Sequence, residues 1–268
     1  MRRRIIMVGL VLGLGDLGAC DLEREDDERE GFRVGYGGTL AYAEPGTGGT
    51  WLGNGLQKPD VSGLDPSHGL NAGNGLKADG GLLSTPEGRD VARYLVECAL
   101  PLGDSISKKV GEEKLTFHGF LGLAPQWKDE GCDQSCQEWV SACLLARTNA
   151  SGQSVDLWVS AAHPSIGLGP SDDYPHYEAT FYGNLFADPP TMFFCRGTEE
   201  GEVAAMANGR TCTGQTPEDC GFTTLGSCFE PDRCELVDGT YAVECADGDP
   251  ATGARHHSLS TYVSAPEQ

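Results

Sequence analysis

Basic side chains are scarce in this chain of 268 residues, which holds 19 lysines and arginines against 40 aspartates and glutamates. Its formal net charge of −21 repels nucleic-acid phosphates and anionic lipid surfaces. We therefore exclude nucleic-acid binding as a main role. Membrane association therefore has to come from a lipid, because the chain has no excess of basic residues to supply it.

Motifs of established chemistry are absent as well. The chain contains no Gly-x-Ser-x-Gly, no His-Glu-x-x-His and no phosphate-binding glycine loop, despite its 38 glycines. It also lacks Cys-x-x-Cys, which argues against a thioredoxin-like redox role, and Cys-x-x-Cys-His, which would attach a haem. The sequence therefore predicts no specific reaction.

The N-terminus resembles the signal peptide of a bacterial lipoprotein. Three arginines at positions 2–4 precede an apolar run from Ile5 to Leu14, which has secretory length and is too short to span a bilayer. Leu17-Gly-Ala-Cys20 is similar to a lipobox. The resemblance implies that residues 1–19 are removed and that Cys20 carries acyl chains such as palmitate. It also implies an extracytoplasmic position in the cell envelope, with the choice of membrane left open. The alternative is a plain secretory peptide with a coincidental cysteine.

Ten further cysteines lie at or beyond position 98. An even number of cysteines outside the cytoplasm indicates a disulfide framework, here of up to five bridges. Treating Cys20 as the anchor removes the odd thiol that would otherwise remain. The ten are Cys98, Cys132, Cys136, Cys143, Cys195, Cys212, Cys220, Cys228, Cys234 and Cys245.

Helix geometry limits how some of these cysteines pair. Cys136 and Cys143 are seven residues apart in a predicted helix, or about 10.5 Å along its axis at 1.5 Å per residue. Disulfide Cα atoms lie within about 7 Å, so these two cannot bond each other. Cys143 therefore needs another element, where Cys98 is a plausible partner, and a Cys132–Cys136 bridge across the helix start is also open. The competing hypothesis is a zinc site of these thiols with His118, which the absence of Cys-x2-Cys pairs disfavours.

The sequence predicts three parts, of which the signal peptide of residues 1–19 is the first. Residues 20–81 are expected to form a flexible stalk, because 21–30 are mostly acidic and 31–81 are rich in glycine. Trp51 and the leucines at 52, 56, 64, 70 and 76 are the exception, since they could dock on the globular part. Residues 82–268 are expected to form the ectodomain, with a cysteine-rich lobe from about Cys212.

The ectodomain is predicted to be α+β, with two early helices packed on a mostly antiparallel β-structure. Ser84 or Thr85 caps the first helix, and an apolar stripe through Cys98 continues it until Pro101. The second helix starts from about Asp133. Apolar alternation predicts strands at 114–118, 155–159, 177–182, 191–195 and 240–245.

Several motifs resemble a family of uncharacterised, cysteine-rich bacterial secreted proteins and lipoproteins. They are Asn74-Gly-Leu, the segments 94–101 and 119–127, and Cys136-Gln-Glu-Trp-Val-Ser-Ala-Cys-Leu-Leu-Ala-Arg-Thr-Asn149, and they cover about residues 74–160. The family has no assigned reaction, so the resemblance supports class and location alone.

The region from His163 to Tyr182 is the candidate site. It gathers carboxylates and imidazoles, which bind metals or perform acid–base work, with tyrosines that could stack on sugar rings. Its members are His163, Asp172, Asp173, His176, Glu178, Tyr174, Tyr177 and Tyr182. The competing interpretation is an acidic loop before a strand with surface histidines. His256 and His257 are expected in an exposed C-terminal tail.

We therefore expect a cell-envelope lipoprotein with a non-enzymatic ectodomain for binding or surface interaction. No metal and no cofactor are expected, and the partner would be an envelope protein or a polysaccharide. The alternative is an extracytoplasmic hydrolase or metal-dependent enzyme that uses His163, Asp173, His176 and Glu178.

Overall fold

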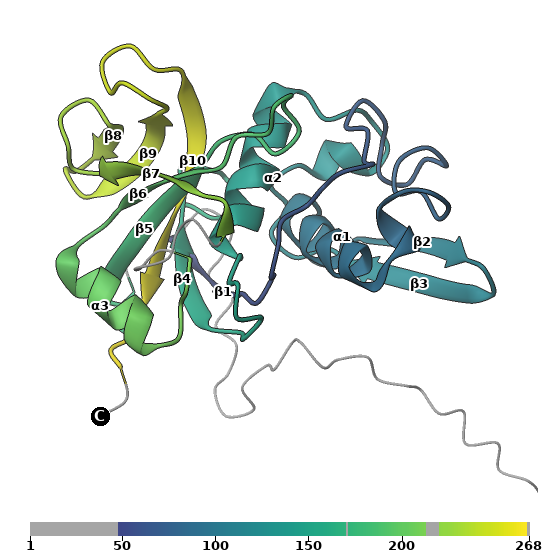
Figure 1. Ribbon diagram of the computed structural model, residues 1–268, viewed down its shortest axis with the longest axis horizontal. Coiled ribbons are helices and arrows are strands. Elements are labelled where there is room, and N and C mark those ends of the chain that lie inside the picture. Colours follow the sequence, from purple (N-terminus) through teal and green to yellow (C-terminus); the bar gives the residue numbers. More distant parts are fainter. Residues whose placement is uncertain (1–47, 170, 213–219, 267–268) are drawn as a thin grey trace, which may run out of the picture. The chain divides into compact units, whose positions relative to one another are not determined.

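An eight-stranded sheet forms the centre of the computed structural model, which describes residues 48–169, 171–212 and 220–266 (Figure 1). Six of its strands lie side by side in the order β1 (Thr50–Gly53), β4 (Asp156–Ser160), β10 (Arg255–Val263), β5 (His176–Tyr182), β6 (Phe193–Arg196) and β7 (Thr223–Ser227). The remaining two are β8 (Cys234–Val237) and β9 (Tyr241–Ala246); β8 pairs with β9, and β9 pairs with the first part of β10. All neighbouring strands are antiparallel except β6 and β7, which are parallel.

Two helices begin where the sequence predicts them. The Thr85 hydroxyl accepts a hydrogen bond from the N–H of Gly88 at the start of α1 (Pro86–Ala99). The Asp133 carboxylate accepts one from the N–H of Cys136 at the start of α2 (Gln134–Ala146). Such caps satisfy N–H groups that have no partner inside the helix. The α+β class with a mostly antiparallel sheet is thereby confirmed.

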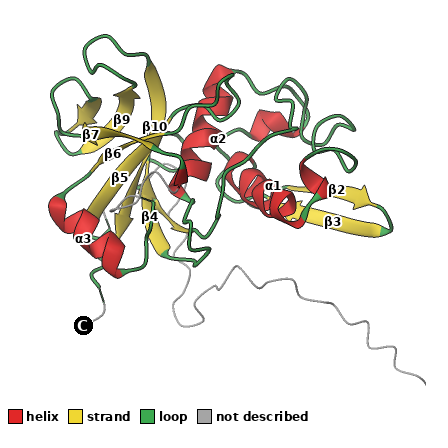
Figure 2. Ribbon diagram, in the orientation of Figure 1, coloured by secondary structure: helices red, strands yellow, loops and turns green. Residues whose placement is uncertain are grey.

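Helix α2 lies between the sheet and α1, as Figure 2 shows. It packs against β5 and β10 on one side and against α1 on the other. Beyond α1 lies a separate hairpin of β2 (Ser105–Val110) and β3 (Glu113–His118). Short 3₁₀ helices, η1 (Leu82–Ser84) and η2 (Pro125–Lys128), precede α1 and α2. None of the described helices is long and apolar enough to cross a bilayer.

A third helix, α3 (Glu199–Ala207), was not predicted. Thr198 caps it, and Glu199, Glu200 and Glu202 lie in its first turn, where negative charge is favourable. It buries only Gly201 and two alanines, so it lacks the apolar stripe that reveals an amphipathic helix. The described residues therefore form three α-helices, the two early ones expected and α3.

The predicted stalk is wrong for residues 48–81. Strand β1 pairs with β4 from Thr50 opposite Val159 to Gly53 opposite Asp156. The leucines at 52, 56, 64, 70 and 76 are all buried, which makes the docking alternative the correct one. Glycine content misled the prediction, because several of these glycines occupy tight turns; Gly55 and Gly63, for example, have positive φ. Residues 20–47, including Cys20, lie outside the described residues.

The two faces of the sheet pack differently. One face contributes Leu157, Phe181 and Phe194 to the main core beneath α2. The other carries Tyr177, Tyr182 and the cysteines of the Cys195–Cys228 and Cys234–Cys245 bridges, among other residues, in a second cluster. Both faces are therefore covered over most of the sheet, and β5 is buried from Tyr177 to Tyr182.

Five disulfides pair the ten cysteines from Cys98 onward. Cys98–Cys143 joins α1 to α2 with Cα atoms 6.0 Å apart, and Cys132–Cys136 spans the start of α2, so both predicted options are confirmed. The other three bridges, Cys195–Cys228, Cys212–Cys220 and Cys234–Cys245, give the expected disulfide-rich C-terminal lobe.

Candidate functional site

Glu178 is a structural residue. Its side chain is fully buried at the point where the β5–β10 register skips a residue, a β-bulge. Oε1 accepts a hydrogen bond from Nε of the equally buried Arg210 at 2.7 Å, and Oε2 accepts one from the Thr261 hydroxyl at 2.8 Å. Arg210 also donates to the carbonyl of Thr148. Because a buried carboxylate needs such partners, this network accounts for Glu178 without catalysis.

The other predicted site residues have separate surroundings. His163 lies in the turn after β4, where its ring meets the ring of Trp139 edge to face at 4.9 Å. Burial lowers its pKa, and the charge of His257 acts in the same direction. Asp172 and Asp173 are exposed in the loop before β5, and His176 is half-buried at the start of that strand. Among the described contacts, these residues and Glu178 share no common partner.

Two of the three expected sugar-stacking tyrosines, Tyr177 and Tyr182, are buried, while Tyr174 is half-buried and its ring stacks on that of Trp158 at 6.4 Å. Tyr177 stacks on Tyr262 at 5.1 Å, and its hydroxyl hydrogen-bonds that of Thr180, which in turn bonds Ser260. Burial raises the pKa of Tyr177 to about 12 and also raises that of Tyr182. Tyr182 donates to the carbonyl of Ala246. These rings form the second core, so they are not available for stacking on a ligand.

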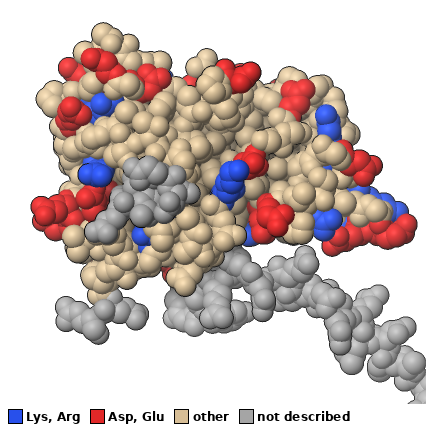
Figure 3. All heavy atoms as spheres, viewed as in Figure 1, with Lys and Arg blue, Asp and Glu red and all other residues tan. Residues whose placement is uncertain are grey.

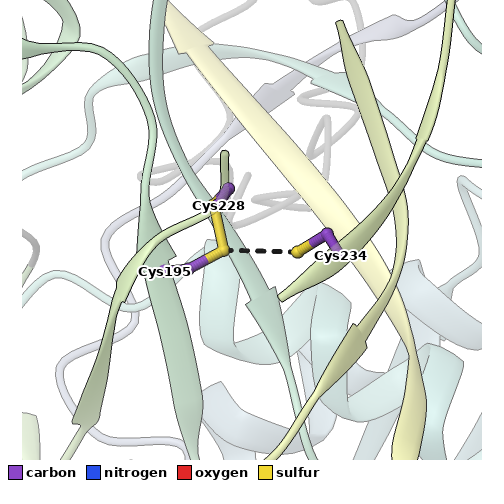
Figure 4. A group of neighbouring side chains, drawn as sticks. All are labelled: Cys195, Cys228 and Cys234. Atoms are coloured by element: carbon purple, nitrogen blue, oxygen red, sulfur yellow. Dashed lines mark hydrogen bonds between the residues drawn. A yellow bond between two sulfur atoms is a disulfide. The ribbon is translucent and has the colours of Figure 1, made fainter. Parts of the chain in front are cut away.

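Three sulfur atoms meet on the same face of the sheet, as Figure 4 shows for Cys195, Cys228 and Cys234. Their Sγ atoms lie within 4.8 Å of one another. Cys195 and Cys228 form one disulfide and Cys234 belongs to another, so none of them is a thiolate that could bind a metal. The 3.6 Å approach of Cys195 to Cys234 is therefore a packing contact between two bridges. His118, the imidazole of the zinc hypothesis, is exposed on β3.

A groove of about 690 Å³ lies between residues 57–64, residues 185–192 and the segment at Cys220. Ligand pockets typically have volumes of about 300–1,000 Å³. Its apolar lining comes from Val61, Leu64, Leu185, Phe186 and Met192, among others. Charged lining comes from Lys58, which pairs with Asp60 at 3.4 Å, and from Asp188. Sequence analysis missed this groove because its first wall was assigned to the stalk.

Comparison with known proteins provides no name for this site. No family model, no curated protein and no solved structure matches the chain.

Proposed function

We propose that this protein is a lipid-anchored component of a bacterial cell envelope, with Cys20 as its anchor and an extracytoplasmic ectodomain for binding. The observation that carries the proposal is the pairing of all ten cysteines from Cys98 onward. Disulfides persist in oxidising compartments and are rare in the cytoplasm. Because these ten pair among themselves, they leave no partner within the chain for Cys20, which supports its use in lipid attachment.

The groove is the proposed binding site of the ectodomain. Its lining includes the apolar side chains of Val61, Leu64, Leu185, Phe186 and Met192, and its charged lining holds two carboxylates against one lysine. That balance disfavours anions, so the chemistry of the groove selects an uncharged, largely apolar small molecule or an apolar side chain of an envelope partner. Phe186 also packs edge to face on the buried Trp127 at 5.4 Å, which keeps this wall in place.

Nile red, an uncharged apolar dye, tests the groove. Wild-type protein should bind it saturably, with a rise in fluorescence. Met192→Ser should weaken binding about tenfold, because loss of the apolar contact between this half-buried side chain and the dye costs roughly 1–2 kcal/mol. The matched control is Met206→Ser, which changes a methionine on α3 that is 39% exposed and outside the groove. Equal affinities of the two variants, or no saturable binding by the wild type, would exclude the groove as a binding site.

A further inference from the structure

His257 lies between a serine and a carboxylate, each facing a different ring nitrogen. The Ser135 Oγ is 3.0 Å from Nε2, and the Glu244 Oε1 is 3.7 Å from Nδ1. His257 on β10 is the direct cross-strand partner of Glu244 on β9, so both side chains project from the same face. A serine nucleophile needs this order of groups, with the base on one nitrogen and an orienting acid on the other.

The elements around Ser135 and His257 restrict their motion. Ser135 lies within the short loop closed by the Cys132–Cys136 disulfide, directly before the residue that Asp133 caps. The ring of His257 stacks on Trp139, one turn further along α2, with centroids 4.6 Å apart and planes within 8°. Preorganisation of this kind is what an active site requires, because looser groups lose effective molarity.

The start of α2 can also supply an oxyanion site. Gln134 and Ser135 are the first two residues of the helix, so their N–H groups have no acceptor within it. The positive end of the helix dipole favours negative charge at the same place. The main-chain N–H of His257 donates to Glu138 Oε2 at 3.2 Å, which ties β10 to α2 at this point.

Ser135, His257 and Glu244 are accessible to solvent, unlike the buried Glu178–Arg210 network. Ser135 is exposed, and the side chain of His257 is 29% exposed. None of the three residues lines the groove, so this is a second, independent site. Its parts come from positions 135, 244 and 257, which no local sequence motif could connect.

We infer that Ser135, His257 and Glu244 form a nucleophile–base–acid triad that cleaves carboxylic esters. The Ser135 Oγ forms a bond to the ester carbonyl carbon while its proton moves to Nε2 of His257. Collapse of the tetrahedral intermediate breaks the carbon–oxygen bond to the leaving alcohol, which takes that proton. Water then attacks the acyl-serine, again through His257, and releases the carboxylic acid and the free serine. No oxidant, metal or cofactor enters the balance.

The charges around the triad indicate the substrate class. Four carboxylates, of Asp133, Glu138, Glu244 and Asp247, lie around the start of α2 and the β9–β10 pair, and they outnumber the guanidinium of Arg255, which donates to the Glu244 carbonyl. They disfavour anionic substrates by electrostatic repulsion. The site is therefore suited to uncharged or cationic esters, and this inference goes beyond the binding function proposed for the groove.

A fluorophosphonate carrying a fluorophore tests the triad in the detergent-extracted full-length protein, because such probes phosphonylate activated serines. We expect a single label, mapped by peptide mass spectrometry to Ser135, and no label in Ser135→Ala. His257→Gln should slow labelling about 100-fold or more, as expected for loss of a general base.

Ser67→Ala is the matched control. The Ser67 hydroxyl contacts Nδ1 of His68 at 3.1 Å and Oδ1 of Asp65 at 2.7 Å, but the Asp65 carboxylate also faces Nδ1, so the ring has no acid on its other nitrogen. Labelling should be unchanged in this variant. Absence of label on Ser135, or equal rates in wild type and His257→Gln, would overturn the triad whatever the result for the groove.

Discussion

At the scale of single residues, His256 is held between two carboxylates. Its Nδ1 lies 3.5 Å from Glu138 Oε1 and its Nε2 lies 3.2 Å from Asp247 Oδ2, and its side chain is only 10% exposed. Burial alone would lower the pKa of His256, but the hydrogen bonds and charges of both carboxylates outweigh burial and raise that pKa above 6.5. For Glu138, burial is likewise outweighed, here by hydrogen bonds from His256, Gln134 and His257, which lower its pKa below 4.5.

These opposite shifts predict a pH window of stabilisation. A raised histidine pKa stabilises the fold fully below pH 6.5, and the effect is lost as pH rises through the folded-state value. A lowered carboxyl pKa stabilises it above pH 4.5, and the effect is lost as pH falls through the folded-state value. Thermal unfolding should therefore show the largest deficit of His256→Gln relative to wild type between those two pH values, and a smaller one at pH 8.

The exposed His118 on β3 provides the control for this measurement. His118→Gln should follow the wild type across the whole pH range. A deficit of His256→Gln that stays constant with pH would mean that His256 contributes by packing and not by charge.

At the scale of elements, helix starts were the most predictable feature and the central strand the least. Thr85 and Asp133 carry local cap signals that act within three residues. Strand β10 was not predicted, and the expectation that its His256 and His257 lie in an exposed tail is wrong, because His256 is buried and His257 is half-buried. Its Ser258, Ser260 and Thr261 are buried, and their hydroxyls find partners in Val243, Thr180 and Glu178, on other strands. Such long-range hydrogen bonds have no signature in the local sequence.

The proposed triad was missed for the same reason. The predicted region around His163 contains suitable residue types close together in the sequence. In the folded protein, however, Glu178 accepts a hydrogen bond from Arg210, and the ring of His163 packs against that of Trp139. By contrast, Ser135 and His257 are 122 positions apart and meet only because α2 packs on β10. The predictions of cysteine pairing were more successful than the search for site motifs. The rise of a helix is a local property, and it correctly excluded a bridge between Cys136 and Cys143.

The disulfide between α1 and α2 should contribute more stability than the one at the start of α2. On the chain-entropy model, the Cys98–Cys143 loop of 45 residues is worth about 4 kcal/mol, and the Cys132–Cys136 loop of 4 residues about 2 kcal/mol. Urea unfolding of the two double-alanine variants under non-reducing conditions measures both values. An equal loss in the two variants, or a larger loss from the short loop, would show that native packing and not loop length decides the contribution.

At the scale of the whole molecule, the acidic surface bears on how the protein would be held at a membrane. Figure 3 shows acidic side chains gathered over α3, where Glu199, Glu200 and Glu202 lie, whereas acidic and basic side chains lie together over the β2–β3 hairpin. Such a surface is repelled by anionic lipid headgroups. An anchor that inserts acyl chains at Cys20 needs no electrostatic help from the ectodomain, because two or more chains hold a protein firmly to a bilayer.

The central claim is that ten cysteines stabilise an extracytoplasmic fold and the eleventh carries its lipid. Peptide mass spectrometry of the membrane-extracted protein, digested without reduction, tests both halves at once. We predict the five bridges described, no free thiol, and an N-terminal peptide that begins at acylated Cys20. Cys20→Ser should keep the five bridges and lose the lipid. An unmodified Cys20, a bridge that includes it, or four or more free thiols among the other ten would contradict the account.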